Sequence, residues 1–263
     1  MKMSHEPSVS TTTLITASFQ WNSSPASDAT TISSGSDRIM PSRGRMKPNI
    51  TTDPVTLTPK HAGGMTEMSR QLIQQSSPDI EQMARDDMAF MLAKAIDSAL
   101  ILGGATNEPT GVLATSGIQT ANLATLSWAN VLAMASKVEL ENAQAASTCW
   151  LGSPEVKAKL AGTLKVSGDA GAGFMLEGGR MDDMAAYFTN QVGRKTGSPD
   201  KLRLILGDWT QVLLGIWSEI DVLVNPFDST AYARGGVKLR AMATVDIGVR
   251  HPKAFVHAED IAL

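Results

Sequence analysis

The stretch SPDIEQMARDDMAFMLAKAIDSALILGGATNEPTGVL, residues 77–113, decides the fold of this 263-residue chain. It opens with a helix start, because Ser77 can cap the first turn and Pro78 suits the first helical position. Apolar residues then recur at three- and four-residue spacing, at Ile80, Ala84, Met88, Met91, Ala95 and Ala99. Glycines from Gly103 onward end the pattern. The spacing predicts a helix over residues 78–102, roughly 37 Å long at 1.5 Å per residue.

Beyond this helix, the sequence predicts a mixture of shorter helices and strands. Ser127 caps a second helix running to about Ala145, and Ser153 with Pro154 opens a third. Residues 163–182 are rich in glycine and predict a mobile loop. Alternating or continuous apolar residues predict strands at 149–151, 202–206, 212–217, 221–224, 237–250 and 255–256.

The first fifty residues differ in composition from the rest of the chain. They hold 17 Ser or Thr residues and show no sustained period, so we expect an extended or disordered arm. A basic cluster within it comprises Arg38, Arg43, Arg45 and Lys47. Such a cluster suits an acidic neighbour or a nucleic acid, although a solvated loop is the more common reading. Residues 49–60, bounded by prolines, predict a short edge strand.

The composition excludes several classes of protein. A net charge of −3 argues against a dedicated nucleic-acid binder, although local basic patches remain compatible with it. The lone Cys149 forms neither an intramolecular disulfide nor a thiolate metal site, which favours a reducing compartment. The sequence shows neither a membrane span nor the apolar core of a secretory signal, and we expect a chain that is cytosolic when made.

A search for catalytic and metal-binding patterns gives little. The four histidines, His5, His61, His251 and His257, are dispersed and lack metal-ligand spacing. The sequence GDAGAG at 168–173 lacks the strand and helix that a dinucleotide fingerprint requires. The pairs Asp86–Asp87 and Asp182–Asp183 are interpreted as solvated or interface charges, because adjacent helical residues point about 100° apart. We therefore predict no catalytic residue, no cofactor site and no metal site.

Residues 54–261 resemble the major capsid proteins of tailed bacteriophages that share the HK97 fold. Three segments carry this resemblance. The first runs from PVTLTPKHAGG at 54–64 to GVL at 111–113. The second is LRLILGDWTQVLLGIWSEIDVLVNPF at 202–227, and the third is the strand at 237–250 with Pro252 and Phe255. In the first segment the matching residues are Ser69, Ser77, Pro78, Asp97, Gly103, Gly104, Pro109 and Gly111.

The resemblance implies an α+β, HK97-like capsid fold with a P domain, an A domain, an E-loop and an N-terminal arm. The P domain would contain a long spine helix and long β-strands. The implied ranges are 1–34 for the N-terminal arm, 35–68 for the E-loop region with its flanking strands, 69–120 for the P domain with the spine helix, 121–233 for the A domain, and 234–263 for the C-terminal strands of the P domain.

The function that the resemblance implies is structural rather than enzymatic. The chain would self-assemble as a homo-oligomer of hexamers and pentamers into an icosahedral phage or prophage shell. This shell would enclose double-stranded DNA without reading its sequence. Scaffold, protease, portal and decoration proteins are the implied partners, no membrane is involved, and the virion, assembled in the bacterial host cytoplasm, is the implied location.

Three alternatives remain open at this point. An encapsulin-like compartment has the same fold and holds cargo protein instead of a genome. A hydrolase would use Asp182–Asp183 or Asp208, but no base, nucleophile or metal partner accompanies them. A soluble binding module is the third.

Two departures from the family pattern matter. Many members carry a long N-terminal scaffolding segment, whereas only a short polar stretch precedes the E-loop region here, so the scaffold is expected to be a separate protein or the chain to be shortened. Some relatives also join a Lys to an Asn beside a Glu. Lys47 and Lys60 offer an amine, but residues 235–245 contain neither Asn nor Glu, which predicts shells without such crosslinks.

Overall fold

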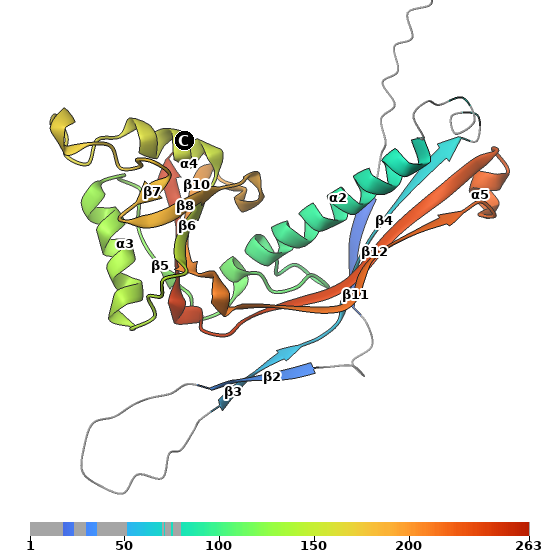
Figure 1. The fold of residues 1–263 in the computed structure, drawn as a ribbon, viewed down its shortest axis with the longest axis horizontal. Helices are drawn as coiled ribbons and strands as arrows, with labels where there is room; N and C mark the ends of the chain where they lie inside the picture. The colour runs from blue at the N-terminus through green and yellow to red at the C-terminus, as the bar shows by residue number, and fades with distance from the viewer. Residues whose placement is uncertain are drawn as a thin grey trace, which may run out of the picture.

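The computed structural model describes residues 18–23, 30–35, 52–69, 71, 75 and 80–262. The molecule is elongated, with a mixed sheet and two helices at one end and a long helix with long strands reaching to the other (Figure 1). This combination confirms the predicted α+β class.

The long helix α2 spans Ile80–Leu102, close to the predicted 78–102, while Ser77 and Pro78 lie outside the described residues. Its buried face consists of Ala84, Met88, Leu92, Ala99 and Ile101. The prediction placed Met91 on this face, but Met91 is only half-buried and Leu92 is buried instead. Both positions continue a three- or four-residue spacing from Met88, and only packing against the sheet distinguishes them.

A four-stranded antiparallel sheet underlies α2 in the order β1-β4-β12-β11. Its strands are β1 (Ser18–Ser23), β4 (Lys60–Ser69), β12 (Gly236–Val249) and β11 (Val212–Asn225). Strand β12 has the predicted alternation, and its apolar positions pack with α2: Val237, Leu239, Ala241 and Ala243. Because two of these are alanines, the helix can approach the sheet closely.

Strand β11 was predicted as two strands, 212–217 and 221–224, but it is continuous. Its pairing with β12 shifts register between Ile216 and Ser218 and again between Ser218 and Asp221. Each shift inserts one extra residue on β11, which bends the strand without ending it. A period-2 reading of the sequence is broken by such bulges, which explains the predicted gap.

The second sheet has seven strands in the order β5-β13-β10-β6-β8-β7, with β9 also paired to β10. The strands are β5 (Gln119–Thr120), β13 (Phe255–Ala262), β10 (Lys201–Asp208), β6 (Thr148–Gly152), β8 (Met184–Phe188), β7 (Arg180–Met181) and β9 (Arg194–Lys195). The helices α3 (Trp128–Leu140) and α4 (Pro154–Gly162) confirm the predicted second and third helices, with Ser127 and Ser153 as N-caps. Their apolar faces and the sheet share one core around the fully buried Trp150.

Shorter elements complete the described part of the chain. These are α5 (Ser229–Tyr232) and the 3-10 helices η2 (Val112–Ala114), η3 (Ala170–Ala172), η4 (Asn190–Val192), η5 (Trp209–Gln211) and η6 (Pro252–Ala254). The glycine-rich stretch predicted as a loop contains η3 and an isolated bridge between Leu164 and Phe174.

The strand pairing divides the chain differently from the ranges inferred from the sequence. Strand β11 falls within 121–233 but pairs with β12, whereas β13 falls within 234–263 but pairs with β10. Strand β1 falls within the predicted arm and pairs with β4 along its whole length. These strands are ordered by partners distant in sequence, which local patterns do not reveal.

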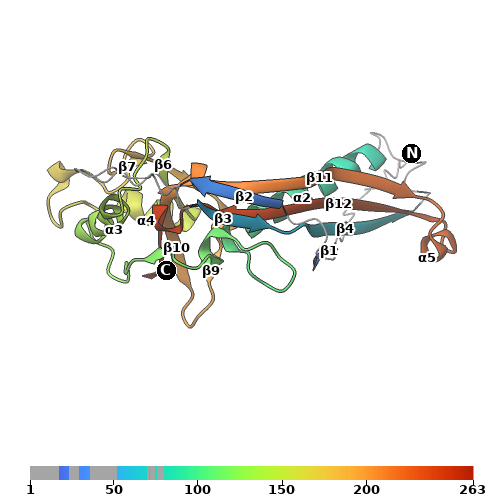
Figure 2. The ribbon, with the colours of Figure 1, turned by 90° about the horizontal axis from the view of Figure 1, so that it is seen from below.

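Strands β2 (Thr30–Gly35) and β3 (Thr52–Leu57) form a separate antiparallel hairpin. In Figure 2 this hairpin lies over the face of the four-stranded sheet that is turned away from α2. The loop between the two strands carries the basic cluster Arg38 to Lys47, which lies outside the described residues. The edge strand predicted at 49–60 corresponds to β3.

Candidate assembly surfaces

The predicted carboxylate pairs are far from forming a shared site. Asp86 and Asp87 are exposed on α2, where Asp86 accepts a 2.8 Å hydrogen bond from Gln82 Nε2. Asp182 and Asp183 are not helical, because they form the two-residue turn between β7 and β8 with φ angles of 51° and 57°. Left-handed backbone at both positions is typical of a tight hairpin turn and favours Asp, Asn or Gly. The pair therefore has a local structural reason to be acidic.

Asp208 is buried at 3% exposure and holds the end of β10 together. Its carboxylate accepts hydrogen bonds from Ser147 Oγ at 2.6 Å, Thr210 Oγ1 at 2.7 Å and Gln211 Nε2 at 2.9 Å. Burial alone would raise the pKa of Asp208, but these hydrogen bonds outweigh it and hold the pKa below its ordinary value. A carboxylate so fully occupied by its own subunit acts as a cap for η5 rather than as a base.

No group of three or more His, Cys, Asp or Glu side chains in the described part of the chain is placed to hold a metal ion. His61 Nδ1 lies 2.8 Å from Thr244 Oγ1, and His257 is half-buried on β13, whereas His5 lies outside the described residues. None of the described helices is long and apolar enough to cross a membrane.

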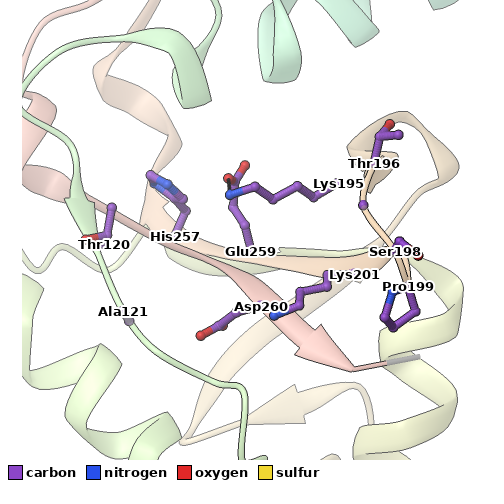
Figure 3. Close-up of a pocket in the computed structure, with 11 residues that line it drawn as sticks. Thr120, Ala121, Lys195, Thr196, Ser198, Pro199, Lys201, His257, Glu259 and Asp260 are labelled. Atoms are coloured by element: carbon purple, nitrogen blue, oxygen red, sulfur yellow. Dashed lines mark ion pairs between the residues drawn. The ribbon is translucent and has the colours of Figure 1, made fainter.

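A charged cluster lies where β13, β10 and β9 meet, beside a cavity of about 420 Å³ (Figure 3). Glu259 bridges Lys195 Nζ at 2.8 Å and Arg203 Nε at 2.9 Å. Burial opposes the ionised form of Glu259, yet the two cations lower its pKa below the ordinary value. The neighbouring His257 has a lowered pKa, chiefly because burial disfavours its charged form. These two ion pairs tie β9 and β10 to β13 within the subunit.

The β2–β3 hairpin contacts the four-stranded sheet at its root, the end of β3 around Val55 and Leu57. There its apolar side chains pack on two glycines of the sheet, Gly215 and Gly248, which form the floor of the contact. Leu57 is only 1% exposed and sits on the four-stranded sheet. A Cβ atom at Gly215 or Gly248 would lie 2.9 Å from a Leu57 methyl group, and one at Gly248 would lie 2.6 Å from Val55 Cγ1. Gly215 and Gly248 therefore leave the space that the hairpin root fills.

A polar cluster, the hairpin-root cluster, surrounds this contact and comprises Thr58, Lys60, Glu108 and Asp246. Asp246 is 4% exposed on β12 and accepts a 2.7 Å hydrogen bond from the Thr58 backbone amide. Lys60 Nζ lies 3.8 Å from Asp246 Oδ1 and donates a 2.6 Å hydrogen bond to the Glu108 carbonyl. The cluster thus joins the hairpin root, the sheet and the turn that follows α2.

Sequence reasoning missed Asp246 as an organising residue. The available signal was the single acid of the VKLRAMATVDIGVR stretch, because it is flanked by the apolar residues Val245 and Ile247, which are buried. A buried carboxylate must find partners, but the sequence does not say that Thr58 and Lys60 supply them.

The free edge of the four-stranded sheet exposes large apolar side chains. β11 is the last strand in the sheet order, and it exposes Leu214, Ile216, Ile220 and Leu223. Between β11 and α2 lies a groove of about 470 Å³, lined on the helix by Ala93, Ile96 and Asp97. Exposed apolar strand edges invite association with another chain, so this edge is a candidate contact surface.

On the face turned away from α2, the same sheet presents Met65 and Leu223 among charged residues. Glu67 on β4 is exposed, and on β11 and β12 Asp221 and Arg240 are exposed as well. Apolar area surrounded by charges is typical of a protein interface with a polar rim.

Comparison with known proteins decides the family. The model of the phage capsid family matches residues 16–260, which is nearly the whole chain. The chain belongs to the phage capsid family. This membership confirms the resemblance found in the sequence and favours a structural role over a catalytic one.

Individual relatives agree with this family. The major capsid protein of Halomonas phage phiHAP-1 is 29% identical over 213 residues, an alignment that covers 76% of this chain and 32% of that protein. The chain therefore spans about a third of the length of this curated relative. Among solved structures, Gordonia phage Cozz matches with a TM-score of 0.65 at 17% identity, covering 90% of this chain and 82% of that one.

A second capsid structure extends the agreement in fold. The capsid of the native GTA particle matches with a TM-score of 0.63 at 17% identity, covering 94% of this chain and 85% of that chain. At this level of identity the likeness concerns the fold alone, and that fold is HK97-like.

Proposed function

We propose that the chain is the major capsid protein of a phage or prophage and assembles into hexamers and pentamers of an icosahedral shell. The observation that carries this proposal is the β2–β3 hairpin, whose strands pair with each other and with no other described strand. A two-stranded hairpin is marginal on its own. A neighbouring subunit would supply the missing contacts, as family membership suggests.

The charges suggest how such neighbours meet. The loop between β2 and β3 has four cations within residues 38–47, and the sheet face away from α2 has the exposed acids Glu67 and Asp221 beside the exposed Arg240. A contact between these two oppositely charged segments of neighbouring subunits would cover Met65 and Leu223. Repeating this head-to-tail contact around an axis closes a ring, and many such contacts reinforce one another.

We also propose that the two domains follow the two sheets rather than continuous ranges of the sequence. The P domain would contain α2, β1, β4, β11 and β12. The A domain would contain α3, α4 and strands β5 to β10 with β13. The connections at 209–211 and 250–254 would then be where the two domains meet.

Double-stranded DNA would be enclosed rather than read, because a chain of net charge −3 offers little general attraction to phosphate. Scaffold, protease, portal and decoration proteins would be the other partners, with assembly in the bacterial host cytoplasm. An encapsulin-like compartment shares this architecture and would contain cargo protein in place of DNA.

The decisive experiment measures size and contents together. The purified chain, expressed alone and with candidate scaffold proteins, is examined by light scattering and electron microscopy. Megadalton icosahedral particles support the proposal, and a small oligomer under every condition contradicts it. Nuclease-protected double-stranded DNA in particles from phage-producing cells would separate a capsid from a cargo compartment, which would contain a co-purifying protein instead.

A further inference from the structure

We propose that Lys60 and Asp246 are positioning residues that fix the direction in which the β2–β3 hairpin leaves the subunit. The consequence for shell geometry rests on the proposed function, whereas the positioning itself concerns the single subunit. The proposal starts from how little chain connects the hairpin to the sheet. β3 ends at Leu57 and β4 begins at Lys60, so Thr58 and Pro59 alone join β3 to the sheet, whereas β2 is joined to β1 of the same sheet through residues 24–29.

The apolar contact at the root fixes where the hairpin sits. Leu57 packs on Gly215 and Gly248, with Val55 on Gly248 and the Trp217 ring beside Gly215. Apolar burial is non-directional, so these contacts restrain the angle of the hairpin through shape alone. Directional polar bonds at the root restrain the angle further.

The hairpin-root cluster supplies these directional bonds. Hydrogen bonds weaken steeply when their angles change, and the Thr58 amide is held 2.7 Å from Asp246 Oδ2. Pro59 has no amide hydrogen, so Thr58 provides the only backbone donor of the link. Rotation about this link would break the hydrogen bond from the Thr58 amide. The Asp246 carboxylate, which is only 4% exposed, would then lose one of the partners that offset the cost of its burial.

Lys60 extends this restraint to a second part of the subunit. Its ammonium group lies 3.8 Å from Asp246 Oδ1 and donates to the Glu108 carbonyl at 2.6 Å. Glu108 belongs to the turn between α2 and η2, where Gly111 N donates to the Gly103 carbonyl at 3.2 Å. The orientation of the hairpin is thereby coupled to the end of the long helix. A neighbouring subunit that binds the hairpin would then affect the position of α2 through the side chains of Lys60 and Asp246.

Distance measurements by electron spin resonance on the full chain test the proposal. Spin labels are attached at Asp53→Cys on β3 and Glu139→Cys on α3, in a Cys149→Ser background. The distance between the two labels reports the position of the hairpin relative to the helix that packs on the seven-stranded sheet. Lys60→Met retains the aliphatic stem but removes both contacts of the ammonium group. We expect the single narrow distance of the parent to become broad or shifted. A matched control, Lys238→Met, removes the Lys238–Asp228 ion pair at the far end of the same sheet and should leave the distance unchanged.

A second variant keeps the test decisive if Lys60→Met does not fold. Asp246→Asn preserves the shape and one acceptor oxygen but removes the charge, and hydrogen exchange at the Thr58 amide should become about tenfold faster. An unchanged distance distribution together with unchanged exchange in the folded variants would overturn the proposal. The measurement uses single subunits, so it is independent of shell formation. If the parent forms no shells, the proposed function fails while the positioning role is still decided.

Discussion

The Thr58 amide and the Asp246 carboxylate are 188 residues apart in sequence and 2.7 Å apart in the structure. This bond connects a hairpin that projects from the subunit to the central strand of the sheet that supports it. On one side of that strand lies α2, and on the other lies the hairpin root. Accordingly, β12 is buried at every residue from Ala243 to Val249. A strand covered on both faces transmits displacement from one face to the other, because packed interiors are close to incompressible.

The buried face of α2 gives the first prediction. Leu92→Ala should lower the free energy of unfolding by about 2–5 kcal/mol, the usual cost of a cavity in a packed core. Leu92 is fully buried, whereas Phe90, two residues earlier, is 69% exposed. Phe90→Ala should therefore change stability by less than about 0.5 kcal/mol. Urea unfolding of subunits compares the two, and equal effects would show that the helix is rotated from the orientation described.

The glycine floor gives the second prediction. Gly248→Ala would place a Cβ atom 2.6 Å from Val55 and 2.9 Å from Leu57, so the hairpin root must move. Overpacking of this kind costs about 1–3 kcal/mol, and we expect that loss in thermal or urea unfolding. Gly162→Ala is the control, because a Cβ atom there meets nothing within 4 Å. A stable Gly248→Ala protein with an unmoved hairpin would contradict the packing of Leu57.

Local patterns in the sequence were enough to predict α2, α3 and α4, because helix periodicity and caps depend on neighbouring residues. They were not enough for the hairpin root. Glycines at 215 and 248 mark close approach within a strand, yet the sequence does not say that Leu57 is what approaches. The pairing of β13 with β10 was missed for the same reason, since a short apolar run does not identify its partner. Contacts between distant segments are decided by packing, which local patterns do not reveal.

The pH dependence of stability gives the third prediction. The pKa of His257 is lowered in the folded protein, chiefly by burial, with Lys195 and Arg203 adding to the effect and Glu259 opposing it. The unfolded chain therefore binds a proton first as the pH falls below the ordinary value of 6.5. Stability contributed by the neutral ring is present above that pH and decreases below it. Unfolding measured between pH 7 and 5 should show this decline, and His257→Gln should make it shallower.

His251→Gln serves as the control for this measurement, because His251 lies outside the cluster of Lys195, Arg203 and Glu259. It should leave the slope as it is in the parent. If His257→Gln also left the slope unchanged, other groups would have to account for the pH dependence.

The apolar edge of β11 gives the fourth prediction. Ile216 is 57% exposed in the monomer, so Ile216→Lys should change the stability of subunits by less than about 0.5 kcal/mol. The same change should strongly reduce shell formation if this edge is covered by a neighbour, because an unpaired charge would be desolvated there. Val166→Lys is matched in exposure at 54% but lies in the glycine-rich loop, and it should assemble more readily. Normal shells from Ile216→Lys, counted by electron microscopy, would remove this edge from the interface.

The last prediction concerns covalent closure of the shell. An isopeptide bond requires a neutral Lys amine placed on a carboxamide, with a carboxylate nearby to accept the proton. Lys60 does not meet this requirement, because its ammonium group is bound within its own subunit to the Glu108 carbonyl and lies near Asp246. On the acceptor side, residues 235–245 contain neither Asn nor Glu, and Lys238 on that strand pairs with Asp228. We therefore expect shells held by noncovalent contacts alone. Particles boiled in denaturant and reductant should run as one band near 27.9 kDa. A ladder of larger bands would contradict this prediction, and mass spectrometry of the excised bands would identify the linked pair.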